Sequence, residues 1–289
     1  MKYLYTCERV SISKLRKVFK LQFDDIKKVL LENDVYVRTQ RESRLTYQYD
    51  ENYFSEIDTP DKAYWLGFIY ADGFITKRAN GSPVFGLTLA DKEPLEKLNE
   101  CLWSNKPIGK YKKTNSYSDK STEYKLAFCS SKMVSNLEKW GCVENKTFKL
   151  KFPTFLSNEL IPHFIRGYFD GDGSVFLHIQ KVKDKEYAML GSQFCGIKSF
   201  LIDLAKYIDA ESCIYKDKRK ETDCWRIQLK SNIRSLKLYH YMYHNSGNMF
   251  LTRKRKKFED FIKDRGSTTT ISNPTYSDTE YKKLCYLED

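Results

Sequence analysis

The sequence has few histidines and lacks the paired cysteines that zinc-binding and disulfide-linked domains use. It holds only four histidines, and its eight cysteines include no CxxC pair. This spacing excludes a zinc-finger module of the usual kind, and we expect small, mostly buried thiols and no disulfides. His240 and His244 lie four residues apart without an acidic or cysteine neighbour, so we interpret them as packing or surface residues.

Long apolar runs are also missing. No segment approaches the roughly 20 apolar residues of a membrane-spanning helix, and residues 1–8 lack the apolar stretch of a signal peptide. We therefore expect an intracellular, cytoplasmic protein with no membrane partner. The hydrophobic fraction is nevertheless 41%, which suffices for packed cores and argues against global disorder.

Acidic residues are outnumbered by basic ones. The chain has 50 Lys and Arg against 38 Asp and Glu, which gives a net charge of +12. Such an excess suits a polyanionic partner. Because the chain has neither a lipidation signal nor a long basic amphipathic helix, nucleic acid is favoured over an anionic membrane surface.

Two similar stretches stand out against this background. Residues 65–73 (WLGFIYADG) and 165–173 (IRGYFDGDG) are each largely apolar, carry glycine at the third position and end in Asp-Gly. One Asp-Gly alone is a common turn dipeptide. Two of them, each heading a similar segment, predict a duplicated unit with pseudo-two-fold symmetry.

The pattern of apolar residues repeats after each stretch. The first copy predicts helices at 61–72, 92–103 and 132–140, with hairpins at 74–78/84–89 and 108–113/123–129. The second predicts a helix ending at 173, helices at 198–208 and 233–243, and hairpins at 174–181/187–194 and 213–218/224–230. We predict an α+β protein of two αββαββα units that pack through the two motif helices.

The domain organisation follows from these elements. We predict a helical unit at 1–45, a linker at 46–58, the first unit at 59–155, the second at 156–265 and a tail at 266–289. In the helical unit, helices at 12–19 and about 22–33 form either a helix-turn-helix that binds DNA or a plain helical hairpin with solvated lysines. Its basic side chains are Lys14, Arg16, Lys17, Lys20, Lys27 and Lys28.

The chemistry is expected where the motif helices meet. Gly67 and Gly167 would let the two backbones approach closely, which places Asp72 and Asp172 side by side. Two adjacent carboxylates share a proton or bind a cation, and oxygen ligands suit Mg²⁺, which promotes phosphodiester hydrolysis. The plainer reading, in which each aspartate only starts a turn, explains both poorly because a carboxylate at a helix C-terminus opposes the helix dipole. Asp170 we interpret as a solvated or capping residue.

The predicted strands are rich in lysine and arginine. If alternate residues face one side, two curved sheets form a saddle that contacts the major groove of DNA. The plainer alternative is a solvated sheet face, and the net charge favours DNA. The predicted DNA-binding residues are Lys77, Arg78, Lys110, Lys112 and Lys125 in the first unit, Lys181, Lys183, Lys216, Lys218, Arg226, Gln228 and Lys230 in the second, and Lys27 and Lys28 in the helical unit.

The paired stretches resemble the motifs of a monomeric, two-motif LAGLIDADG homing endonuclease, over about residues 53–263. The resemblance implies that Asp72 and Asp172 bind Mg²⁺, with Mn²⁺ as a substitute, helped by the carbonyls of Ala71 and Gly171. It implies that Lys146 and Lys254 polarise solvent near the metals and that Gln193 orders water. The counterpart of Gln193 is unclear, since residues 87–90 offer only Thr88 as a polar candidate.

The family implies a site-specific double-strand DNA endonuclease, and the sequence alone does not choose between a bacterial, a phage and an organellar context. An RNA-binding intron maturase on the same fold, with intron RNA as partner, is a first alternative. A DNA-binding regulator that does not cleave is a second. An intein is disfavoured because no Cys or Ser start and no His-Asn end flanks the chain.

Overall fold

The computed structural model describes residues 1–8, 10–39, 47–77, 81–112, 122–146, 149–218 and 223–266. The chain divides into two compact units, Met1–Gln48 and Tyr49–Asp289. The finer boundaries at 58, 155 and 265 stay predictions, and the tail lies outside the described residues beyond Gly266. Within the described part, no helix is long and apolar enough to cross a membrane.

In its described residues, 1–8, 10–39 and 47–48, the N-terminal unit has three short helices, α1 (Lys2–Thr6), α2 (Ile12–Phe19) and α3 (Phe23–Glu32). The Ser11 side chain caps α2, and Lys20 ends it in the left-handed conformation with a φ of 54°. Gln22 then opens α3 through a capping box with Asp25. A turn of three residues therefore joins α2 to α3, whose bounds lie close to the predicted 12–19 and about 22–33.

A small core holds these helices together. Its buried residues are Tyr5, Ile12, Leu15, Ile26, Leu30 and Val35. Neither α1 nor the role of Tyr5 is predicted from the sequence. The Tyr5 hydroxyl accepts a hydrogen bond from the Arg38 N–H at 2.7 Å. The guanidinium of Arg38 also covers the Tyr5 ring at 4.0 Å, so α1 is tied to the end of the unit.

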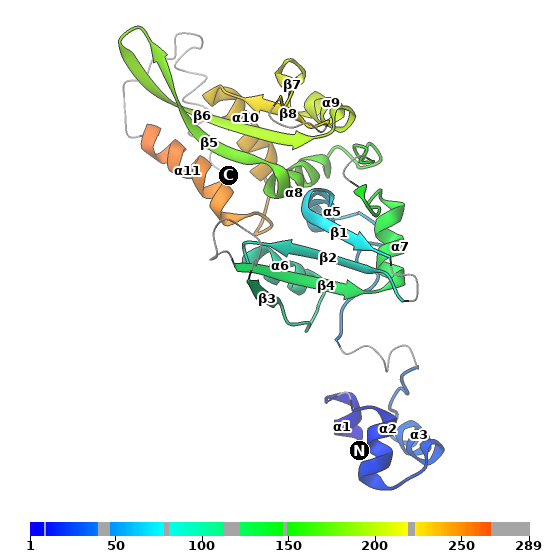
Figure 1. Cartoon of the computed structure of the whole chain (residues 1–289). Coiled ribbons are helices and arrows are strands. Elements are labelled where there is room, and N and C mark those ends of the chain that lie inside the picture. Colours follow the sequence, from blue (N-terminus) through cyan, green and yellow to red (C-terminus); the bar gives the residue numbers. More distant parts are fainter. Residues whose placement is uncertain are drawn as a thin grey trace. The chain divides into compact units, whose positions relative to one another are not determined.

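The second compact unit contains the duplication (Figure 1). Its first repeat consists of α5 (Pro60–Asp72), β1 (Gly73–Thr76), β2 (Val84–Leu89), α6 (Glu93–Cys101), β3 (Gly109–Lys112), β4 (Thr122–Cys129) and α7 (Ser131–Lys139). The second consists of α8 (Ile161–Asp172), β5 (Ser174–Val182), β6 (Lys185–Gly196), α9 (Lys198–Tyr207), β7 (Ile214–Lys216), β8 (Trp225–Leu229) and α10 (Asn232–Tyr243). The predicted αββαββα order is confirmed for both repeats.

Each repeat forms a four-stranded antiparallel sheet with the same topology. The orders are β1-β2-β4-β3 and β5-β6-β8-β7. One face of each sheet packs on its helices, as the buried side chains of Phe85, Leu87, Leu126 and Phe128 show in the first. The hairpins differ in length, since β1 and β2 have 4 and 6 residues whereas β5 and β6 have 9 and 12.

The two repeats meet through α5 and α8, which lie side by side between the sheets (Figure 1). A Cβ on Gly67 would lie 2.0 Å from the Phe164 carbonyl oxygen, and a Cβ on Gly167 would lie 1.9 Å from the Tyr64 carbonyl oxygen. The helices thus touch backbone to backbone at both points, and only glycine fits there. The predicted packing of the units through their motif helices is confirmed.

One further helix, α11 (Thr252–Gly266), follows the second repeat and packs against β5. This helix is not predicted from the sequence, because the segment is rich in charged residues and has few apolar positions. Phe258 and Phe261 are its buried hydrophobic residues, and the pairs Arg255–Glu259 and Lys256–Asp260 stabilise its outer face at i, i+4 spacing.

The cysteines differ in part from expectation. All seven described cysteines are free, but only Cys142 is buried, so the prediction of mostly buried thiols is wrong. The others lie on surfaces or at partly covered positions, where their small size suits the edge of a packed layer.

Candidate active site at the ends of the motif helices

The two motif helices end at the same relative place for local reasons. In α5 the Thr59 side chain caps the start and Pro60 occupies the first turn. After Asp72 and Asp172 the chain turns directly into a strand at Gly73 and Gly173, both in extended conformation. A Cβ on either glycine would lie 2.6 Å from the carbonyl oxygen four residues earlier, so glycine permits this abrupt change of direction.

The close approach continues to the helix ends. A Cβ on Gly171 would lie 2.2 Å from the Ala71 Cβ and 3.2 Å from Oδ2 of Asp72. The Asp72 carboxylate therefore lies against the end of α8, where Asp172 follows. Asp72 and Asp172 both remain exposed at the rim. The structure thus places the two predicted aspartates at adjoining helix ends.

Two lysines approach these helix ends from other parts of the chain. Lys146 Nζ donates to the carbonyl oxygens of Ala71 at 3.0 Å and Gly73 at 2.6 Å. Lys254, in the first turn of α11, donates to the equivalent carbonyls of Gly171 at 3.1 Å and Gly173 at 2.6 Å. Each predicted lysine therefore lies beside its predicted aspartate, in matching positions.

The second lysine is more enclosed than the first. Lys254 Nζ also contacts the carbonyls of Phe169 and Asp170, both at 2.7 Å, and the residue is 4% exposed. Burial lowers the pKa of Lys254 to about 8, against the opposing effect of the Asp170 charge. Burial also lowers the pKa of Lys146, which the charges of Asp172 and Asp72 oppose.

The aspartates and lysines form one electrostatic group. Asp72 keeps an exposed edge, but the groups packed around it remove part of its hydration and raise its pKa, and the positive charges of Lys254, Lys146 and Arg253 counteract that rise. Both lysines are within electrostatic reach of both aspartates. Ionised carboxylates and ammonium groups therefore stabilise one another at this edge.

Gln193 has a defined place and a defined counterpart. It pairs with Ser174 in β5 and Gln228 in β8, and its Oε1 accepts a hydrogen bond from Arg226 at 3.3 Å. The matching register of the first sheet puts Gly86 opposite Phe74 and Ala127, which makes Gly86 the equivalent residue. The candidate Thr88 is thus not the counterpart, and the first repeat has no side chain there.

Asp170 is not solvated, contrary to our interpretation. It is 2% exposed, and its Oδ2 accepts hydrogen bonds from the Tyr64 hydroxyl at 3.0 Å and the Leu251 N–H at 2.7 Å. Burial raises its pKa to about 6, which the Lys254 charge opposes. The sequence does not predict that Asp170 is buried, because the matching residue of the first repeat is Tyr70, which does not indicate a carboxylate in the interface.

The predicted DNA-binding residues do not all share one sheet face. Lys125 lies opposite Thr88 on the face without helices, and Arg226 and Gln228 occupy that face in the second sheet. Strand alternation places four others on the opposite side, so the prediction of a single basic face is wrong for them. They are Lys110, Lys112, Lys181 and Lys216.

The remaining predicted residues lie at strand ends and turns. Lys77 forms an ion pair with Glu138 at 2.7 Å, Lys183 lies in the β5–β6 turn, and Lys218 and Lys230 are exposed after their strands. Arg78 lies outside the described residues. The open faces also carry polar and aromatic residues that are not among the predicted ones. Counting alternate residues along the strands from Gln193 and Lys125 would have identified them. They include Tyr111, His178, Gln180 and Tyr215.

The oxygen atoms at the helix ends fit a hard divalent cation. In the described ranges, no group of three or more His, Cys, Asp or Glu side chains converges on one position. A cation would instead be held by two carboxylates with backbone carbonyls, a donor set that Mg²⁺ accepts when water and phosphate complete it. The Lys254 ammonium among four carbonyl oxygens shows that these helix ends attract positive charge.

Comparison with known proteins agrees with this architecture. Residues 59–140 match the model of the LAGLIDADG-like domain, which spans the first repeat from the cap of α5 to the end of α7. The first repeat is therefore similar to a LAGLIDADG-like domain, in agreement with the family resemblance of its motif. No curated protein matches the chain.

Several solved structures resemble the chain. The LAGLIDADG meganuclease I-AabMI bound to uncleaved DNA is 14% identical, with 80% of this chain and 99% of that chain covered and a TM-score of 0.48. I-CpaMI bound to uncleaved DNA is 15% identical, with 73% and 94% covered and a TM-score of 0.48. I-SmaMI bound to uncleaved DNA target in the presence of calcium ions is 15% identical, with 79% and 98% covered and a TM-score of 0.46.

Proposed function

We propose that this protein is a site-specific double-strand DNA endonuclease, a homing endonuclease that hydrolyses phosphodiester bonds with divalent metal held by Asp72 and Asp172. One observation carries the proposal. The reciprocal contacts of Gly67 and Gly167 bring two equivalent helix ends together, and each end presents an aspartate with a lysine on its carbonyls. A structural turn needs neither the pairing nor the lysines.

The residues divide the work as follows. Asp72 and Asp172, with the carbonyls of Ala71 and Gly171, would hold Mg²⁺ or Mn²⁺, which supplies a hydroxide nucleophile and stabilises the leaving oxygen when bound. Lys146 and Lys254 offset the negative charge that develops on the phosphate. Gln193 orients water in the second repeat.

The open faces of the two sheets would bind the DNA. Lys125 and Arg226 occupy equivalent positions there, and Gln228 lies beside Arg226 on β8. Arg226 is held by Asp217 at 2.7 Å, so its orientation is set before DNA arrives. Because one chain carries both sheets and both aspartates, a monomer would contact the whole site.

The N-terminal unit would add a second DNA contact as a helix-turn-helix. Lys27 and Lys28 lie on α3, and Lys14, Lys17 and Lys20 are exposed on or after α2. The variant Lys27→Gln/Lys28→Gln of the full chain should weaken DNA binding and reduce the salt dependence of log K by about 2. An unchanged salt dependence would favour the plain helical hairpin.

The central test replaces the aspartates one at a time. Asp72→Asn and Asp172→Asn are assayed with Mg²⁺ on a plasmid library that carries candidate insertion sites, with Asp203→Asn on the exposed face of α9 as control. Each active-site variant should lose cleavage of one strand and leave a nick, whereas the control should cut both strands. If both variants cut as well as the parent, the assignment is wrong.

The same preparations separate the alternatives. Tight, metal-independent duplex binding without nicking would support a regulator in place of an endonuclease. Binding of intron RNA with faster splicing, in the absence of DNA cleavage, would support a maturase. Cleavage that EDTA abolishes and Mg²⁺ restores would support the endonuclease.

A further inference from the structure

A group of buried polar side chains ties the segment before α11 to α8. Arg166 is fully buried, and it donates from Nε to the Met249 carbonyl at 2.7 Å and from Nη1 to the Met242 carbonyl at 2.6 Å. Asp170, one helical turn later on α8, accepts from the Leu251 N–H at 2.7 Å. The last turn of α10 and the segment that follows it are therefore held at three backbone positions by two side chains of one helix.

The other motif helix takes part in the same network. The hydroxyl of Tyr64, on α5, donates to Asp170 Oδ2 at 3.0 Å, and the Arg166 guanidinium lies 5.2 Å from the centre of the Tyr64 ring. Buried ionic groups are costly unless they are well bonded. A carboxylate and a guanidinium kept here at such a cost suggest a role beyond filling space.

Lys254 depends on this anchor. Leu251 directly precedes α11, and its carbonyl accepts the Lys254 N–H at 3.0 Å and the Arg255 N–H at 3.2 Å. Asp170 thus fixes the residue on which the first turn of α11 is built. Lys254 projects from that turn onto the carbonyls at the end of α8, including that of Gly171.

The first repeat has no such anchor at the matching positions. Leu66 and Tyr70 stand where the second repeat has Arg166 and Asp170, and the Tyr70 hydroxyl donates to the Trp140 carbonyl. Lys146 contacts only the carbonyls of Ala71 and Gly73 among the helix-end oxygens. The duplication therefore supplies two lysines that are positioned by different means.

We propose that Asp170, bridged to Tyr64 of the other repeat, is a positioning residue for Lys254, so that cleavage of one DNA strand depends on this network and cleavage of the other does not. This inference rests on the proposed endonuclease function. A merely structural network would affect overall stability, and both strands would then slow alike.

Three full-chain variants test the inference. Tyr64→Phe removes one hydrogen bond and keeps the ring, Asp170→Asn keeps an acceptor for the Leu251 N–H, and Asp170→Ala removes both bonds. Tyr70→Phe is the matched control in the first repeat, because it removes a hydroxyl from the equivalent position on the other side. Circular dichroism and duplex affinity establish that each variant is folded.

Two measurements are made on each variant. The first is the single-turnover nicking rate of each strand on a duplex labelled at both ends. We expect Asp170→Ala to slow one strand by about 10²-fold, the scale on which a small misplacement of a catalytic group acts. Asp170→Asn should recover to within about tenfold of the parent, and Tyr70→Phe should leave the ratio of the two strand rates unchanged.

The second measurement does not need activity. Acetic anhydride labels lysines in the metal-free protein, and mass spectrometry gives the labelling of Lys254 relative to Lys146. The ratio should rise in Asp170→Ala and stay constant in Tyr70→Phe. Equal slowing of both strands, or an unchanged labelling ratio, would overturn the inference. If the parent cuts no duplex, the endonuclease proposal fails, and the labelling ratio alone decides whether Asp170 positions Lys254.

Discussion

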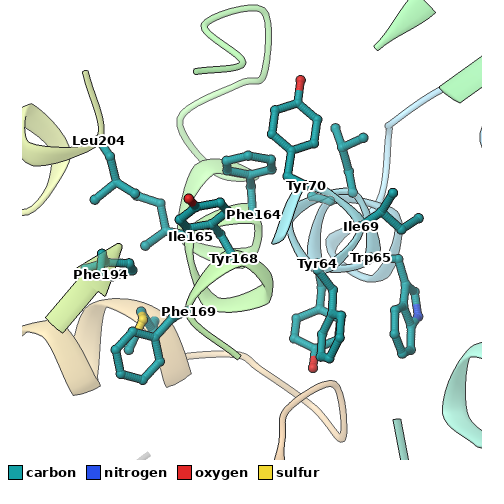
Figure 2. Packing of buried hydrophobic residues seen from close by; sticks show 14 of the residues in the cluster. Tyr64, Trp65, Ile69, Tyr70, Phe164, Ile165, Tyr168, Phe169, Phe194 and Leu204 are labelled. Atoms are coloured by element: carbon teal, nitrogen blue, oxygen red, sulfur yellow. The ribbon is translucent and has the colours of Figure 1, made fainter. Parts of the chain in front are cut away.

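The two sides of the motif interface hold different chemistry at equivalent positions. On one side Tyr64 meets the carboxylate of Asp170, and on the other Phe164 meets the ring of Tyr70 edge to face at 5.1 Å. Figure 2 shows Tyr64 and Tyr70 on opposite sides of α5, with Phe164 beside Tyr70. The duplication has kept the backbone contact and let the flanking side chains diverge.

This difference shows which parts of the interface between α5 and α8 tolerate a change of side chain. The glycine contacts are reciprocal because they involve backbone atoms, which no substitution alters. The flanking pairs only need to fill space and satisfy their polar atoms, so one side can be polar and the other aromatic. We therefore expect the two repeats to contribute equally to stability through their glycine contacts. We expect them to differ in the surroundings of Lys146 and Lys254.

The largest effect is expected where the two sides are equivalent. Gly67→Ala and Gly167→Ala should each destabilise the fold by about 3 kcal/mol or more, because the new methyl group would overlap a backbone oxygen of the facing helix. Denaturant unfolding measures the cost. Gly247→Asn is the control, since nothing lies within 4 Å of that position and asparagine tolerates its φ of 54°. If one substitution lowered the free energy of unfolding much less than the other, the two glycine contacts would not be equivalent.

The two lysines allow the repeats to be compared by the rates at which the two DNA strands are cleaved. Lys146→Met and Lys254→Met should each slow one strand by about 10²-fold, as expected when a group that stabilises transition-state charge is lost. Strand-resolved single-turnover kinetics measure the effect, with the exposed Lys206→Met on α9 as control. If either variant slowed both strands equally, the assignment of one lysine to one strand would be wrong.

One contribution to the pH dependence of stability comes from a residue of the second repeat that has no counterpart in the first. Burial, with the Arg166 charge, lowers the pKa of His163 to about 4, whereas Ala63 stands at the equivalent position. Its Nδ1 must accept from Arg166 Nη1 at 3.0 Å, because a guanidinium only donates. The unfolded chain therefore binds the extra proton between about pH 6.5 and 4. This contribution to stability is complete above pH 6.5 and is lost as the pH falls through 4.

The difference between parent and His163→Asn isolates that contribution. Asparagine can accept the same hydrogen bond without titrating, so the parent should lose on the order of 2 kcal/mol relative to the variant between pH 7 and 4, after allowance for solvent screening. Chemical unfolding across this range gives the values. Asp170 titrates with the opposite sign, since its raised pKa favours the folded state at low pH, and it is common to both proteins. Parallel curves for the two proteins would contradict the prediction.

The smallest effect is expected at Gln193. Gln193→Leu should slow one strand by about tenfold, the equivalent of about 1.4 kcal/mol, because the strand position remains filled but the amide is lost. Gly86 at the equivalent place contributes no side chain, so the other strand should be unaffected. Strand-resolved rates at saturating DNA measure the change, and an equal loss on both strands would show that Gln193 does not act locally.

Much of this architecture follows from the sequence because it depends on periodicity and repetition. The element order of both repeats, the glycine contact and the pairing of Asp72 with Asp172 all follow from the two similar stretches. Lys146 and Lys254 came from the family resemblance, since nothing in their local sequence indicates a contact with distant carbonyls.

The rest depends on contacts between distant segments. The burial of Asp170 rests on Tyr64 and Leu251, which lie 106 and 81 residues away along the chain. The faces of Lys110 and Lys216 depend on strand register, which charge alone does not set. The helix α11 is stabilised by two buried phenylalanines and its docking on β5, a tertiary effect that its charged composition conceals.

The unequal hairpins bear on the length of DNA that each half would cover. At about 3.3 Å per residue, the 6 residues of β2 extend roughly 20 Å and the 12 residues of β6 roughly 40 Å. With one base pair per about 3.4 Å of duplex, those spans correspond to roughly 6 and 12 base pairs. On the proposed function, the recognition sequence would therefore be asymmetric about the cleavage positions. More base pairs would be contacted on the side of the second repeat than on the side of the first.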